Sequence, residues 1–110
     1  MAVNYSEELD RLEPEMKEAL FLSLNEDKSE NVRLAALEAL SRYAGVTDIR
    51  RDLVKSFSIQ TDPIIQISMI NMMVNLNEKE SIPIFKNLIA DENTYESVKK
   101  QATQGLKLLL

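Results

Sequence analysis

VRLAAL, at residues 32–37, carries the pattern that decides this fold. The pattern returns 33 residues later as IQISMI at 65–70, and again after 33 more as VKKQAT at 98–103. Val32, Ile65 and Val98 correspond, as do Ala36, Met69 and Ala102. The register continues through Leu40, Met73 and Leu106. Self-similarity at a fixed period indicates one supersecondary unit that is copied and stacked, each copy burying its neighbour's apolar face.

The composition favours helices as the repeated element. The chain has 110 residues, with only two Gly and three Pro, and is rich in Leu, Ala, Glu and Lys, which favour helix. Apolar residues spaced by four predict amphipathic helices, and Asp62-Pro63 marks one helix start. The predicted helices cover residues 6–12, 14–25, 30–43, 47–58, 63–76, 81–90 and 95–109. We therefore expect an all-α protein in which three helical hairpins follow a short N-terminal helix.

Sets of apolar residues locate the expected core. On the outer helices, the predicted buried stripes are Met16, Leu20 and Leu24, then Ile49, Leu53 and Phe57, then Ile84 and Leu88. On the first inner helix, the predicted core residues are Val32, Ala36, Ala39, Leu40 and Tyr43, with equivalents one and two periods later.

Three hairpins with this pattern resemble HEAT repeats. The resemblance rests on Leu20, Leu24, Asp27, Val32-Arg33, Ala36, Ala39 and Leu40 in the first unit. The second unit has large Met69 and Met72 where small residues are expected, and the third has an inner loop two residues longer than the first unit's. The resemblance implies a right-handed α-α superhelix of the HEAT/armadillo type. It implies one domain over residues 1–110, with repeats at about 14–45, 46–78 and 79–110.

The resemblance also implies a structural role for Arg33 and Asp27. In such repeats, an Arg at this place on the inner helix commonly pairs with an Asp in a hairpin turn and ties neighbouring repeats together. Lys99 with Asp91 is a weaker form of the same pair, and Gln66 interrupts the series.

Five apolar side chains fall beyond the core stripe of the inner helices, where the resemblance places the concave surface: Leu34, Leu37, Ile67, Ile70 and Val74. Exposed, contiguous apolar surface usually marks an interface. These five residues are therefore the predicted partner-binding site, although wide packing between repeats would instead bury them in the core.

Catalytic and metal-binding patterns are missing from the sequence. There is no His and no Cys, which removes the commonest general base and the usual zinc ligands. There is also no Gly-rich phosphate loop. We expect no enzyme activity, no cofactor and no bound metal. The net charge of −5 argues against a nucleic-acid partner, and no apolar run is long enough to span a membrane.

The favoured function is a protein-protein interaction or scaffold module that binds a helix or an extended peptide segment. The apolar last residues suggest a fragment of a larger protein, such as a regulatory one. The alternative is a HEAT-like subunit of an enzyme system such as a phycobilin lyase. The sequence does not fix the compartment. The cytoplasm is the default, and an extracytoplasmic tail of a membrane protein is also compatible.

Overall fold

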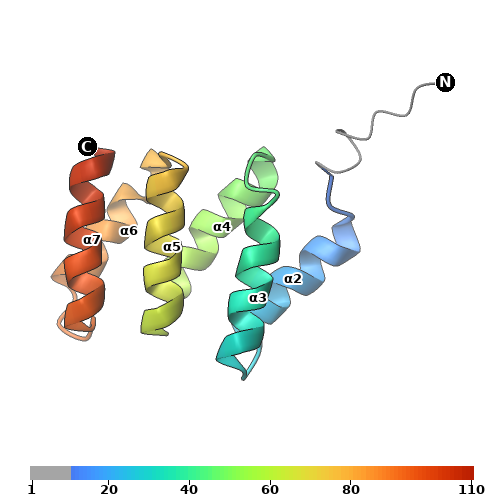
Figure 1. Cartoon of the computed structure of the whole chain (residues 1–110), viewed down its shortest axis with the longest axis horizontal. Helices are drawn as coiled ribbons and strands as arrows, with labels where there is room; N and C mark the ends of the chain where they lie inside the picture. Colours follow the sequence, from blue (N-terminus) through green and yellow to red (C-terminus); the bar gives the residue numbers. More distant parts are fainter. Residues whose placement is uncertain (1–10) are drawn as a thin grey trace. The chain divides into compact units, whose positions relative to one another are not determined.

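The computed structural model describes residues 11–110, which form six α-helices and one 3-10 helix without a β-strand. The elements are α2 (Pro14–Glu26), α3 (Glu30–Ser41), α4 (Thr47–Ile59), α5 (Pro63–Asn75), η1 (Lys79–Ser81), α6 (Ile82–Ala90) and α7 (Glu96–Leu109) (Figure 1). This confirms the all-α prediction, and the predicted helix boundaries from residue 14 onward agree within two residues. Most of the predicted helix 6–12 lies outside the described residues, and residues 11–13 are not helical.

The described chain divides into two compact units, one ending at Ser56 and the other beginning at Phe57. The division falls inside α4, so the last three residues of this helix, 57–59, belong to the second unit.

In the first unit, α2 packs against α3. The buried apolar side chains come from α2, α3, the following turn and α4: Leu24, Ala36, Leu37, Leu40, Ala44, Ile49 and Leu53. Ser29 caps α3, because its hydroxyl accepts a hydrogen bond from the Val32 backbone N–H at 3.3 Å. Of the predicted stripe on α2, only its last residue, Leu24, is fully buried. Met16 is 53% exposed, so the prediction is wrong for this residue.

In the second unit, α7 packs against both α5 and α6. Figure 1 shows α5 and α7 running side by side. The rings of Phe57 and Phe85 meet edge to face, with centroids 5.6 Å apart. Phe85 is fully buried, whereas the predicted stripe residues Ile84 and Leu88 are only half-buried. The core-facing side of α6 is thus rotated from the predicted one.

The start of α5 follows the sequence prediction. The Asp62 carboxylate accepts a hydrogen bond from the Ile64 backbone N–H at 2.8 Å, and Pro63 occupies the first turn, where its missing N–H costs nothing. The first buried side chain of the helix, Ile65, follows at once. This cap fixes where α5 begins.

Candidate functional site

The five predicted partner-binding residues do not share one environment. Leu37 and Ile70 are buried, with 3% and 1% of their surface exposed, so the expectation that they are surface anchors is wrong. They complete the core because helix packing buries a wider stripe than the period alone indicates. Leu34, Ile67 and Val74 are half-buried and keep part of their surface accessible. Their role in binding a partner stays a prediction.

Arg33 is held against the turn that precedes its own helix. Its Nη1 donates a hydrogen bond to the backbone carbonyl of Asp27 at 2.7 Å. The Asp27 carboxylate accepts from the backbone N–H of Ser29 at 2.8 Å, so it organises the turn. This bond lies within a single hairpin, and the predicted tie between neighbouring repeats stays a prediction.

Gln66 performs the same task one period later. Its Nε2 donates to the backbone carbonyl of Gln60 at 2.9 Å, and residues 60 and 66 lie 33 positions after 27 and 33. Sequence reasoning treated Gln66 as a break in the series and missed this bond. The 33-residue offset was the signal that could have found it. The shared feature is a side-chain donor that satisfies a carbonyl at a helix end.

The third turn differs from the other two. The Asp91 carboxylate accepts from the backbone N–H of Asn93 at 2.9 Å, which repeats the arrangement of Asp27 and Ser29. Among the described residues, no ion pair joins Lys99 to Asp91, so the weaker pair expected there is not formed. The segment from Asp91 to Lys99 is two residues longer than the segment from Asp27 to Arg33.

A groove of about 410 Å³ runs between α5 and α7. Its lining combines apolar groups with four carboxamides: Ile70, Val74, Gly105 and Leu108, with Asn71, Asn75, Gln101 and Gln104. Gly105 is essential to this shape. A Cβ added there would come within 2.7 Å of the Phe85 ring and 3.0 Å of Val74. The helices therefore approach closely at Gly105, which presents no side chain to the groove.

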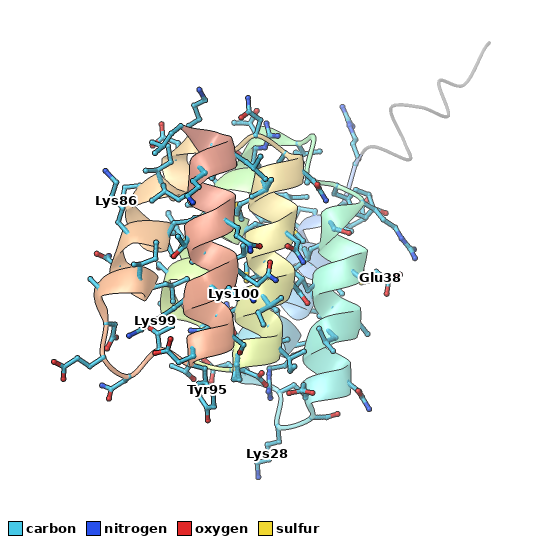
Figure 2. All side chains as sticks on the ribbon, turned by 60° about the vertical axis from the view of Figure 1, so that its left-hand side comes forward. Lys28, Glu38, Lys86, Tyr95, Lys99 and Lys100 are labelled. Atoms are coloured by element: carbon cyan, nitrogen blue, oxygen red, sulfur yellow. The ribbon has the colours of Figure 1, made fainter. Side chains whose placement is uncertain are left out.

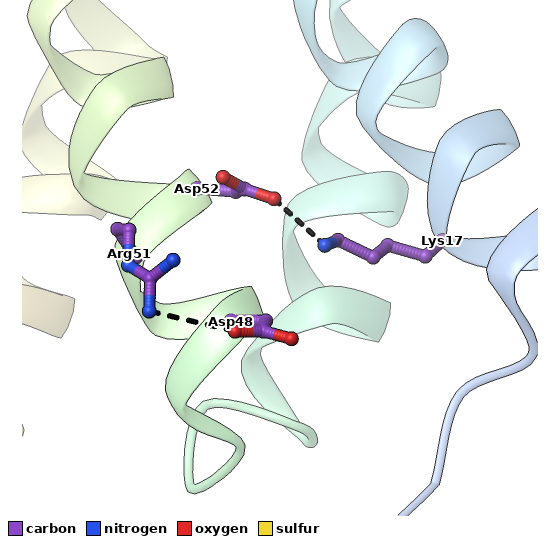
Figure 3. Close-up of polar contacts among 4 residues, drawn as sticks. All are labelled: Lys17, Asp48, Arg51 and Asp52. Carbon is purple, nitrogen blue, oxygen red and sulfur yellow. Dashed lines mark ion pairs between the residues drawn. The ribbon is translucent and has the colours of Figure 1, made fainter.

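The charged residues of α4 pair mostly within the first unit. Lys17 Nζ on α2 reaches Asp52 Oδ2 at 2.8 Å, and Arg51 lies 3.5 Å from Asp48 on the same helix (Figure 3). Arg50, Arg51 and Lys55 place three positive charges on α4, and the pair of Arg51 with Asp48 partly neutralises them, which suits a solvated outer surface.

The described residues offer no obvious centre for metal or membrane binding. Within residues 11–110, no group of three or more Asp or Glu side chains is placed to hold a metal ion. None of the described helices is long and apolar enough to cross a membrane.

These features define a helical repeat protein, with hairpins that repeat their turn contacts at a fixed period. Residues 17–107 match the family of HEAT repeats. The match covers most of the chain, and the protein belongs to the HEAT-repeat family. Comparison with curated proteins finds no match, and neither does comparison with solved structures.

Proposed function

We propose that the chain binds an extended segment of a partner protein in the groove between α5 and α7. HEAT repeats are generally protein-interaction or scaffold modules, and the described residues are consistent with a short helical solenoid. The observation that carries the proposal is the pairing of four carboxamides with an apolar floor in one groove.

The carboxamides suit a peptide main chain. Each provides a donor and an acceptor, and a peptide group needs both. Asn71 and Asn75 are four residues apart on α5, so they share one helical face and are separated by about 6 Å along it. An extended chain repeats its orientation every two residues, or about 6.6 Å. The two amides therefore match alternate peptide groups of a segment that runs along the helix.

The apolar part of the groove gives such a segment a place for its side chains. Val74 is half-buried and Leu108 is 71% exposed, so both offer accessible apolar surface beside the carboxamides. No charged residue lines the groove, which favours recognition of the main chain and of apolar side chains over recognition of charge. Of the two occupants expected from the sequence, a helix or an extended segment, the groove favours the extended segment.

The experiment is a selection of linear peptides displayed on phage against the whole chain, followed by affinity measurements on synthetic peptides. Asn71→Ala and Gln104→Ala should each weaken binding about two- to tenfold, because each removes one or two hydrogen bonds. Asn31→Ala is the matched control, since Asn31 is exposed on α3 and does not line the groove. Equal affinity of all three variants for the selected peptides would contradict the proposal.

A further inference from the structure

The second unit holds another cavity, of about 310 Å³, where α4 and α6 end. Its lining comes from the last turn of α4 and the residues after it, from α5 and α6, and from the loop before α7: Phe57, Ser58, Ile59, Gln60, Thr61, Gln66, Ile84, Asn87, Leu88, Asp91, Asn93, Thr94 and Tyr95. It shares no residue with the groove between α5 and α7. Its volume is at the small end of ligand pockets and suits one side chain.

The electrostatic character of this cavity favours a cation. The C-terminal ends of α4 and α6 and the N-terminal ends of α5 and α7 all contribute lining residues, so the opposite partial charges of the helix ends offset one another and the side chains decide the sign. The one ionisable carboxylate in the lining is Asp91, and no Lys or Arg lines the cavity. Lys99 lies one turn beyond Tyr95 on α7 and is outside the lining (Figure 2).

Gln66 supplies an acceptor inside the cavity. This side chain is only 7% exposed, and its Nε2 is already bonded to the Gln60 carbonyl. Among the described residues, no donor reaches its Oε1. This oxygen keeps some accessible surface, so a ligand in the cavity can donate an N–H group to it.

The walls suit a long aliphatic stem. Ile84 and Leu88 are half-buried beside the cavity, and Ile59 is 62% exposed at its edge. Tyr95 is the last loop residue before α7 and is 61% exposed (Figure 2). An exposed aromatic ring at the rim of an acceptor-rich cavity can stack on a guanidinium plane.

We infer that this cavity binds the side chain of an arginine from a partner polypeptide. The guanidinium offers five N–H donors in a plane, which matches several separate acceptors better than the single ammonium of lysine. Asp91 supplies the opposite charge, Gln66 an acceptor oxygen, and Tyr95 the ring. The inference is independent of the proposed groove, because the two sites use different residues.

The test is an NMR titration of the whole chain with N-acetyl-arginine methylamide. The same derivatives of citrulline and leucine serve as controls. Citrulline has nearly the shape of arginine but no charge, and leucine is apolar. The arginine compound should shift the Gln66 side-chain amide and the backbone signals of residues 57–61 and 87–95 in a saturable way. The citrulline compound should shift them less, because it lacks the charge. Equal shifts with citrulline or leucine would overturn the inference, as would the absence of any shift at Gln66.

Variants make the test specific. Asp91→Asn keeps an acceptor for the Asn93 N–H but removes the charge, and should weaken binding about two- to fivefold. Glu92 is the next residue along the chain and does not line the cavity. Glu92→Gln removes one negative charge there, as Asp91→Asn does in the lining, and should change binding less. Tyr95→Leu should also weaken binding. Lys99→Gln should leave binding equal or stronger, and a weakening there would mean that the cavity takes an anion, which contradicts the inference.

Discussion

The two compact units are stabilised by different kinds of contact. In the first, polar groups link the elements: Lys17 pairs with Asp52, and the Ser56 hydroxyl donates to the side-chain oxygen of Asn25 across 31 residues of sequence. In the second, the distinctive contacts are apolar, namely the Phe57–Phe85 ring pair and the close approach at Gly105. The comparison shows that one repeat pattern tolerates different chemistry so long as helix spacing and turn geometry are kept.

The largest effect should come from the ring pair of the second unit. Phe85→Ala removes a fully buried ring and its contact with Phe57, and should lower the free energy of unfolding by about 3–5 kcal/mol. Phe21→Ala is the matched variant in the first unit, where the ring on α2 is half-buried, and should cost less. Urea unfolding followed by circular dichroism measures both. A cost for Phe21→Ala equal to that for Phe85→Ala would break the distinction between the units.

Gly105→Ala tests the close approach of helices. The new Cβ would meet the Phe85 ring at 2.7 Å, and a buried ring cannot yield as the tip of a flexible side chain would. Overpacking should outweigh the better helix propensity of Ala and leave a net loss of about 1–2 kcal/mol.

Gly45→Ala is the control for Gly105→Ala, because nothing lies within 4 Å of its added Cβ and its φ is not positive. In thermal melts of both variants, Gly45→Ala should be neutral or slightly stabilising and Gly105→Ala destabilising. If Gly105→Ala were as stable as Gly45→Ala, the helices would not be in close contact at this position.

The sequence predicted the helices well because their signals are local or strictly periodic. The 33-residue offset set the hairpins, and the proline after Asp62 fixed the start of α5. The partner patch was only partly predictable. The periodicity of the apolar residues places Leu37 and Ile70 on one face of their helices. It does not say how much of that face a neighbouring helix covers.

The two candidate sites depend on three-dimensional spacing that the sequence did not reveal. The groove between α5 and α7 depends on the missing side chain at Gly105, which brings helices together. The cavity near α6 depends on the longer loop, which contributes Asn93, Thr94 and Tyr95 to its lining. No local motif marks either arrangement. The turn contact of Gln66, in contrast, was available from the offset alone.

Removing the turn contacts should cost more stability at the buried donor, Gln66, than at the half-buried one, Arg33. Gln66→Leu keeps the volume but leaves the Gln60 carbonyl without its donor, and should cost about 1–2 kcal/mol. Arg33→Leu should cost less than about 1 kcal/mol, because Arg33 is half-buried and water can replace its bond to the Asp27 carbonyl. Arg33→Gln keeps a donor and should lose less still. Chemical denaturation measures these losses. A larger loss in the free energy of unfolding for Arg33→Leu than for Gln66→Leu would contradict the argument from burial.

The smallest effect should come from the ion pair of the first unit. A double-mutant cycle with Lys17→Met and Asp52→Asn should give a coupling of about 0.2–1 kcal/mol, because both side chains keep contact with water. The pair Asp48–Arg51 is longer, at 3.5 Å, and its side chains are 72% and 60% exposed, so its coupling should be smaller.

Salt should reduce the Lys17–Asp52 coupling, since mobile ions screen charges that solvent reaches. A coupling that stays constant from low to high salt would mean that Lys17 acts through the packing of its alkyl stem. The first unit would then resemble the second in being stabilised mainly by apolar contact.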